Sequence, residues 1–373
     1  MRILLITAAL LAVRTLGGDM TRDVYFGTYT HAAKSEGIYH ATLDLKTGAL
    51  STPELAAAVA NPSFIDVHPT GKFLYAVTEG EAGMVSAFAI DPATRKLRLL
   101  NACPSGGSGP CHLAINREGT LLLVANYGSG SVAAIPIRAN GTLSGPSSVI
   151  QHHGSSVNPA RQNEPHAHSI TFSPDGRLAF AADLGLDKIM IYTVNAATGT
   201  LAPHVPAFVS IKGGAGPRHF TFHPNGRFAY LINELNNTLT AYAYNAQSGA
   251  LTEVQLISTL PEDFNGVSWA AEVRIHPNGN FLYASNRGHD SLASYRIDPA
   301  TGILTRVGFQ RSGIDNPRHF NLDPSGRFCV VANQDSDRVC TFRVNPETGA
   351  LEPVGTPVTI GQPVCVRFML YSN

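Results

Sequence analysis

The sequence has little charge, few cysteines and no long apolar segment. Its 27 Lys and Arg residues balance 27 Asp and Glu residues, and no run is rich in Lys or Arg, which argues against an electrostatic nucleic-acid binder. The five cysteines lack CxxC spacing, so they predict neither a zinc site nor a disulfide framework. Cys329 and Cys340 could face each other across a hairpin, but we expect two buried thiols.

Motifs of two common hydrolase classes are also missing. The sequence contains no G-x-S-x-G elbow and no H-E-x-x-H helix, so nothing in it indicates a serine nucleophile or a metal. No segment of useful length has the periodicity of a helix. We therefore expect an all-β protein without a metal or other cofactor.

Residues 1–22 stand apart as a leader. Arg2 followed by ILLITAALLAV resembles the start of a signal peptide, but Arg14 interrupts the cleavage region and no clear A-x-A follows. The apolar run is too short for a membrane span. We expect a cytoplasmic protein that does not bind membranes, and a periplasmic or secreted one if residues 1–19 act as a signal peptide.

The sequence is rich in residues that favour turns, with 35 Gly and 24 Pro. A strand–turn–strand unit such as TFHPNGRFAYLINE (221–234) recurs six times. Its turn glycines lie 47 to 57 residues apart at Gly71, Gly119, Gly176, Gly226, Gly279 and Gly326. This period is typical of a β-propeller, whose blades bury their faces against one another.

A second signal recurs seven times, as in DLKTGAL (44–50) and NPETGAL (345–351). The extra copy indicates a repeat that is split between the termini. DVYFGTYT matches a second strand of the repeat, and the C-terminal GQPVCVRFML matches only a first strand. We therefore predict a seven-bladed β-propeller over residues 23–373, with four antiparallel strands per blade and a ring closed by the N- and C-terminal strands.

Residues that recur in most repeats are expected to serve the blade. The residue before each turn is expected to stabilise that turn, and the set is His68, Asn116, Ser173, His223, His276 and Asp323. The asparagine seven residues after the turn glycine is expected to cap the end of a strand, as at Asn126, Asn233, Asn286 and Asn333.

Residues that depart from their own repeat are candidates for function. His168, Arg218 and Arg318 occupy one position at the start of the first strand, where consecutive blades form a ring around the axis. His219, Glu272 and His319 follow that position directly. Glu234, after the structural Asn233, and Arg274, inside its strand, depart as well. The longest insertion, the polar and His-rich 151–169, is also expected to be functional.

The motifs HAHSITFSPDGR, AGPRHFTFHPNGRFAYLINEL and DFNGVSWAAEVRIHPNG resemble the lactonase family of seven-bladed propellers, which includes propeller-type 6-phosphogluconolactonase and carboxy-cis,cis-muconate cyclase. The resemblance covers residues 23–373. It implies an active site in the axial cleft with His168, Arg218 and Glu234, and the second arginine of some family members is matched by Arg274.

The resemblance implies hydrolysis of a sugar lactone, foremost 6-phosphogluconolactone. We expect the protein to be a monomer. In this hypothesis Glu234 is the general base, Arg218 polarises the carbonyl and His168 protonates the leaving alkoxide. Arg274 and Arg318 orient an anionic group, with His219, His319 and Glu272 also in the substrate site. Two alternatives remain open: a muconate-type lactonising cycloisomerase and a propeller that only binds a partner.

Overall fold

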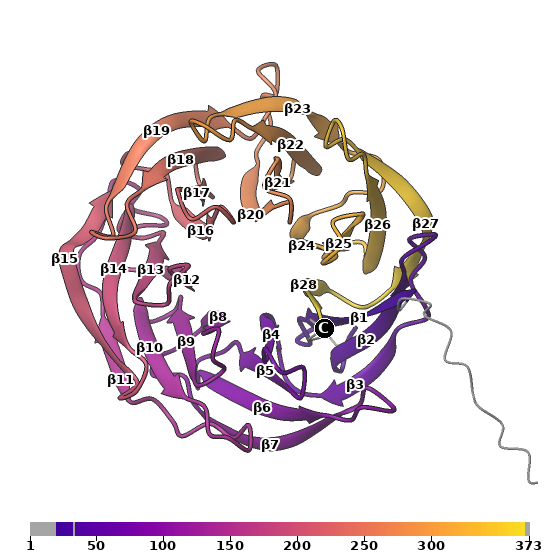
Figure 1. Cartoon of the computed structure of the whole chain (residues 1–373), viewed down its shortest axis with the longest axis horizontal. Coiled ribbons are helices and arrows are strands. Elements are labelled where there is room, and N and C mark those ends of the chain that lie inside the picture. The colour runs from indigo at the N-terminus through magenta and orange to yellow at the C-terminus, as the bar shows by residue number, and fades with distance from the viewer. Residues whose placement is uncertain (1–19, 33, 370–373) are drawn as a thin grey trace, which may run out of the picture.

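The computed structural model describes residues 20–32 and 34–369. In this part of the chain, 28 strands form seven four-stranded sheets, which are arranged as a ring around a central axis (Figure 1). All strand pairs are antiparallel, as in the hairpin of β16 and β17. The predicted all-β, seven-bladed propeller is therefore confirmed. None of the described residues form a helix long and apolar enough to cross a membrane.

The two inner strands of each blade come from the recurring strand–turn–strand unit. The innermost strands are β4 (Ile65–Val67), β8 (Pro110–Ile115), β12 (Ala167–Phe172), β16 (Pro217–Phe222), β20 (Trp269–Ile275), β24 (Pro317–Leu322) and β28 (Pro363–Phe368). Their neighbours are β5 (Phe73–Thr78), β9 (Leu121–Asn126), β13 (Leu178–Asp183), β17 (Phe228–Asn233), β21 (Phe281–Arg287), β25 (Phe328–Asn333) and β1 (Thr21–Thr28).

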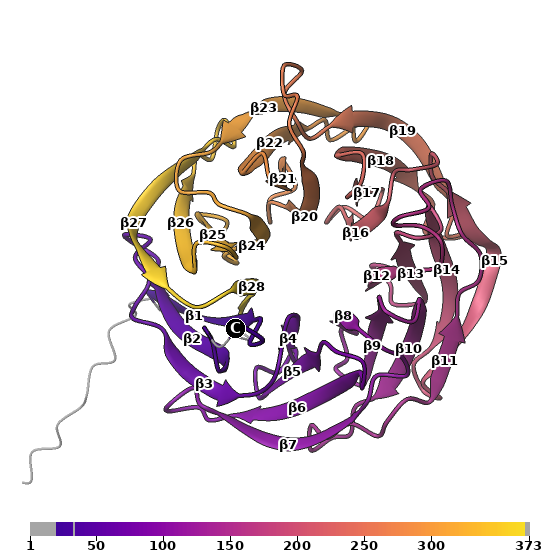
Figure 2. The same cartoon turned by 180° about the vertical axis from the view of Figure 1, so that it is seen from behind.

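The two outer strands flank the second sequence signal. The third strands are β6 (Met84–Ile90), β10 (Ser131–Pro136), β14 (Lys188–Asn195), β18 (Thr238–Tyr244), β22 (Ser291–Ile297), β26 (Arg338–Val344) and β2 (Gly37–Asp44). The outermost strands are β7 (Leu97–Pro104), β11 (Ser148–Gln151), β15 (Thr200–Ser210), β19 (Leu251–Ser258), β23 (Leu304–Gln310), β27 (Leu351–Thr359) and β3 (Glu54–Ala58). The reverse view shows the same concentric order (Figure 2).

The ring closes through the termini of the propeller. β28 pairs with β1, with Val24 opposite Phe368 and Phe26 opposite Val366, and becomes the innermost strand of the sheet that also contains β2 and β3. This confirms the predicted split repeat. β1 begins at Thr21, two residues before the expected domain boundary, so residues 21 and 22 of the expected leader belong to the propeller. Residues 1–19 lie outside the described residues.

Both turn signals join neighbouring blades. The hydroxyls of Tyr75, Tyr230 and Tyr283 donate hydrogen bonds to the carbonyls of Gly141, Gly302 and Gly349 in the next blade. A Cβ at Gly302 would lie 2.6 Å from the ring of Phe228, so this turn has no room for a side chain. The glycine in the second signal is thus required by the packing between blades.

The histidines before the inner turns do more than stabilise their own turn. The Nε2 atoms of His68, His223 and His276 lie 2.7 to 2.9 Å from the carbonyl oxygens of Gly119, Gly279 and Gly326, each in the following blade. Asn116, Ser173 and Asp323, which replace histidine in other repeats, accept hydrogen bonds from backbone N–H groups of their own turn. The predicted structural role is confirmed.

The core lies between adjacent sheets. In one buried cluster Tyr230 and Ile232 of β17 pack with Leu282 of β21 and Tyr295 of β22. All five cysteines are buried free thiols, including Cys329 and Cys340, as expected.

Candidate active site

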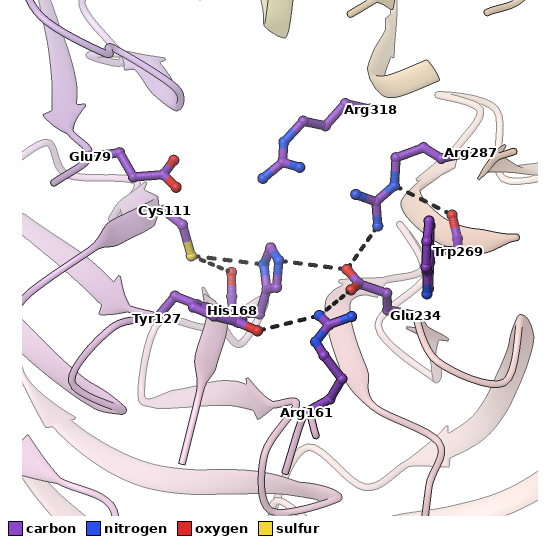
Figure 3. A pocket seen from close by; sticks show the side chains of 9 residues that line it. All are labelled: Glu79, Cys111, Tyr127, Arg161, His168, Glu234, Trp269, Arg287 and Arg318. Atoms are coloured by element: carbon purple, nitrogen blue, oxygen red, sulfur yellow. Dashed lines mark hydrogen bonds and ion pairs between the residues drawn. The ribbon is translucent and has the colours of Figure 1, made fainter. Parts of the chain in front are cut away.

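A cavity of about 290 Å³ lies among the innermost strands. Side chains from six blades and one long loop point into it (Figure 3). Its volume is at the small end of the range for ligand sites, which suits a small metabolite. The lining residues are Glu79, Cys111, Tyr127, Arg161, His168, Glu234, Trp269, Arg287 and Arg318.

Bulges in the innermost strands of four blades change the direction of one side chain in each. The pairing of β8, β12, β16 and β24 with their neighbours shifts register at one residue near the start of each strand. The residues at these shifts are Cys111, His168, Arg218 and Arg318. A bulged residue leaves the normal alternation of faces, which explains why these side chains do not join the apolar face of the strand.

A second set of lining residues lies directly beside the first. Because Pro217 pairs with Asn233, the start of β16 lies next to the end of β17, and Glu234 follows at once. Glu79 and Tyr127 follow β5 and β9 in the same way, and Arg287 is the last residue of β21. Two repeat positions therefore build most of the cavity wall.

Glu234 is the centre of an ion-pair cluster. Its Oε1 lies 2.8 Å from Nη2 of Arg161, and its Oε2 lies 3.0 Å from Nε of Arg218 and 2.8 Å from Nη2 of Arg287. Burial would raise the pKa of Glu234, but Arg287, Arg218 and His168 outweigh it and hold the pKa far below its usual 4.5. A carboxylate held in this way stays ionised and has little tendency to accept a proton.

His168 lies beside this cluster in a neutral state. Its Nε2 is 3.9 Å from Oε2 of Glu234, and its Nδ1 is 3.8 Å from Sγ of Cys111. Burial first, and then the charge of Arg218, lower the pKa of His168 well below 6.5. The distance from Nε2 to Glu234 exceeds a hydrogen bond, so this nitrogen remains available to a ligand or a water molecule.

The long insertion brings Arg161 into the site. Nη2 of Arg161 lies 2.8 Å from Glu234 and 3.4 Å from the hydroxyl of Tyr127. The loop is anchored by His152, whose Nδ1 lies 2.6 Å from Asp183, and by the buried amide of Gln162, which donates to the carbonyl of Leu184. These anchors hold the arginine in place although it lies on a loop.

A second polar cluster lies next to the cavity. Oε2 of Glu272 is 3.0 Å from both Nδ1 of His219 and Nε2 of His319, and its Oε1 is 3.2 Å from Nε of Arg274. Nη1 of Arg218 lies 3.3 Å from Nε2 of His219 and donates to the carbonyl of Ala271. This cluster therefore contacts Nη1 of Arg218, while Nε of the same guanidinium faces Glu234.

The comparisons with known proteins decide the family. The model of a family described as "Lactonase, 7-bladed beta-propeller" matches residues 23–368. The chain belongs to this lactonase family. A Bacillus subtilis (strain 168) relative named 6-phosphogluconolactonase is 36% identical over 352 residues, 94% of this chain and 99% of the relative.

Two solved structures share the fold of this lactonase-family chain closely. Pseudomonas aeruginosa periplasmic gluconolactonase, PpgL, has a TM-score of 0.89 and 33% identity, with coverage of 94% of this chain and 100% of that one. A Bacteroides fragilis NCTC 9343 protein has a TM-score of 0.89 and 35% identity, with coverage of 94% and 99%. The family resemblance drawn from the motifs is confirmed.

The structure brings some predicted residues of this family member together and separates others. His168, Glu234 and Arg318 line the cavity. Arg218, His219 and His319 line a much smaller void of about 10 Å³ next to it, which also touches His168 and Arg318. Glu272 and Arg274 line neither space and pair with each other instead. In the described part of the chain, no three His, Cys, Asp or Glu side chains gather as a metal site requires.

Sequence reasoning missed six of the lining residues as site candidates. A signal existed for Glu79, Tyr127 and Arg287, because each directly follows the repeated strand-end position, as Glu234 does. Cys111 shares the ring position of His168. Arg161 lies in the insertion 151–169, which is expected to be functional but has no counterpart in the other repeats, and Trp269 is the first residue of β20. Spacing alone does not show that either side chain reaches the cavity.

Acid should destabilise this propeller from about pH 6.5 downward. Burial lowers the pKa well below 6.5 for His112, His168, His219 and His319. The unfolded chain regains the ordinary histidine pKa and binds protons that the folded state excludes, so each histidine removes about 1.4 kcal/mol per pH unit. Urea unfolding at pH 8, 6 and 5 measures this loss. A free energy of unfolding that is constant over this range would contradict it.

Proposed function

We propose that this protein hydrolyses a sugar lactone to the open-chain hydroxy acid in the cavity around Glu234, with 6-phosphogluconolactone as its foremost substrate. The observation that carries the proposal is the convergence of Arg161, Arg287 and Arg318 with the neutral His168 on one small cavity. The named relatives support it, since the Bacillus subtilis protein is named 6-phosphogluconolactonase and the Pseudomonas aeruginosa protein gluconolactonase.

His168 is the general base in this proposal. The sequence predicts that Glu234 takes the proton of the attacking water. Three guanidiniums, however, form ion pairs with its carboxylate oxygens and lower its pKa. Neutral His168 has an available Nε2 and an ionised carboxylate 3.9 Å away that stabilises the imidazolium once formed. The carboxylate of Glu234 offsets part of the effect of burial and of Arg218, which together keep the pKa of His168 low, so the imidazole is neutral at pH 7 and free to take a proton from water.

The reaction then follows from these positions. Water attacks the lactone carbonyl carbon while Nε2 of His168 takes its proton. The oxygen that becomes negative is stabilised by the guanidiniums facing the cavity. The tetrahedral intermediate collapses, the bond to the ring oxygen breaks, and the imidazolium returns the proton to that oxygen. The carboxylic acid formed releases its proton to solvent.

The charges around the cavity favour an anionic substrate. Arg161, Arg218, Arg287 and Arg318 bring four positive charges, against two negative charges from Glu79 and Glu234. Arg318 makes no hydrogen bond or ion pair within the described residues, and its guanidinium points into the cavity (Figure 3). A planar guanidinium of this kind can bind a phosphate through two parallel hydrogen bonds.

The test is an assay of purified protein on 6-phosphogluconolactone and gluconolactone, measured above the spontaneous opening rate. We expect faster turnover of the phosphorylated lactone, with or without EDTA, because guanidiniums supply the positive charge. Arg318→Ala should raise KM for the phosphorylated lactone roughly ten- to a hundredfold, the scale of a charged hydrogen bond, and less for the neutral one. Arg311→Ala, an exposed arginine on the preceding loop, is the matched control.

Absence of turnover above background for both lactones would overturn the proposal. A preference for the phosphorylated lactone would also support the expected cytoplasmic location. A preference for the neutral lactone would favour export and would contradict the role of Arg318 in binding a phosphate.

A further inference from the structure

Glu79 is a carboxylate in the cavity that the reaction above does not use. It follows β5 and lines both the cavity and the smaller void. Figure 3 shows Glu79 and Glu234 on opposite sides of the cavity, each with its carboxylate directed inward. The two carboxylates have different surroundings in one small site, so we expect them to have different roles.

The environment of Glu79 is the reverse of that of Glu234. Glu79 has one polar side-chain partner, the neutral hydroxyl of Tyr29, which donates to its Oε2 at 3.0 Å. Within the described residues its Oε1 makes no hydrogen bond and no guanidinium or ammonium nitrogen lies within ion-pair distance. An ionised carboxylate can only accept hydrogen bonds, so this oxygen lacks a donor that a ligand would have to bring.

Arg318 faces the same cavity and lacks an acceptor for its N–H groups among the described residues. Its guanidinium lies 5.3 Å from the ring centroid of Tyr29 and has no polar partner in the described part of the chain. Tyr29 therefore touches both groups, donating to the carboxylate and stacking under the cation. A ligand that satisfies both must carry hydroxyl donors for Glu79 and an anionic acceptor for Arg318.

We propose that Glu79, held by Tyr29, is a specificity-determining residue that accepts hydrogen bonds from hydroxyl groups of the substrate. The inference rests on the proposed function and narrows its substrate to a polyhydroxylated anion. Glu79 also rejects a hydroxyl-free dicarboxylate, because a second carboxylate placed against it would be repelled and leave its own oxygen unpaired. Sites built to bond a hydroxyl discriminate strongly against analogues that lack it.

Binding measurements on Glu79→Gln test this directly. The change keeps the shape but removes the charge and turns one acceptor into a donor. Calorimetry with 6-phosphogluconate should show binding weakened roughly ten- to a hundredfold, the scale of losing hydrogen bonds to a charged group. Adipate, a six-carbon dicarboxylate without hydroxyls, should bind more tightly than to the unaltered protein. Equal losses for both ligands, or no loss for 6-phosphogluconate, would overturn the proposal.

The chain offers a matched control two residues away. Glu81 is exposed and does not line the cavity, so Glu81→Gln makes the same change in net charge and should leave both affinities unchanged. Tyr29→Phe keeps the carboxylate but removes its support, and should shift selectivity in the same direction by a smaller factor. This variant keeps the proposal testable if Glu79→Gln fails to fold, as a thermal melt would reveal.

Kinetics separate recognition from chemistry. Glu79→Gln should lose much more kcat/KM on gluconolactone than on δ-valerolactone, which has the ring ester but no hydroxyls. A parallel loss on both lactones would place Glu79 in the chemical step and overturn its role as a selector. If the unaltered protein hydrolyses neither lactone yet binds 6-phosphogluconate through Glu79, the proposed reaction fails and this inference stands.

Discussion

Replacing His168 by asparagine is expected to lower kcat by roughly 10²- to 10⁴-fold, the usual contribution of a positioned acid–base group. Asparagine keeps polarity at the site but cannot carry a proton between water and the ring oxygen. Substrate binding should change less, because the arginines that line the cavity remain. Steady-state kinetics on 6-phosphogluconolactone, corrected for spontaneous opening, measure the effect.

The dependence of kcat on pH tests the same role of His168. Because the pKa of His168 lies well below 6.5, the base is neutral at pH 7, and kcat should fall only when the pH drops below that lowered value. His168→Asn should remove this acid limb. His153→Asn, at an exposed histidine of the same insertion, should keep both the rate and the limb. A His168→Asn variant within tenfold of normal kcat would exclude His168 as the base.

The same profile on Glu234→Gln separates the two candidate bases. If Glu234 only organises the site, this variant should keep the acid limb and raise KM, since three guanidiniums lose their shared anion. If Glu234 were the base, the limb would vanish and KM would change little.

The fold could be predicted because the sequence repeats itself. Counting two turn signals gave seven blades, and the mismatch between six and seven copies located the closure that β28 and β1 make. Comparison between the repeats also located part of the site. His168 and Glu234 differ from the residues at equivalent positions of other repeats, and both line the cavity. Glycine and histidine at the turns recur because they bind the next blade.

The protonation of the site could not be predicted in the same way. Glu234 looks like a base when taken alone, yet its pKa depends on which cations meet it, and Arg161 and Arg287 come from a long loop and a different blade. The repeat position marks Arg287 as a candidate, but spacing in the sequence does not show which cations reach the carboxylate of Glu234. The register shifts that turn His168 and Arg318 toward the axis are also invisible, because a bulge changes the direction of a side chain and leaves the strand pattern intact.

The other large effect concerns closure of the ring. Deleting residues 361–373 should abolish cooperative unfolding and solubility, because it removes the whole of β28. All six residues of β28 are buried, and Val366 and Phe368 pack in one cluster with Phe328 of the neighbouring blade. Burying such side chains contributes roughly 1.5–3 kcal/mol each, so the loss approaches the total stability of an ordinary domain, about 5–15 kcal/mol.

The deletion also exposes a strand edge and disturbs the polar cluster. β1 keeps β2 but loses its inner partner, so it presents unpaired N–H and C=O groups along the channel, which are a template for aggregation. The backbone N–H of Val366 donates to Nδ1 of His319, which leaves Nε2 of that ring to donate to Glu272, so removing β28 also frees His319. Deleting only residues 370–373 leaves β28 intact and is the matched control. A chain without residues 361–373 that melts at the same temperature as that control would show that β28 does not hold the ring closed.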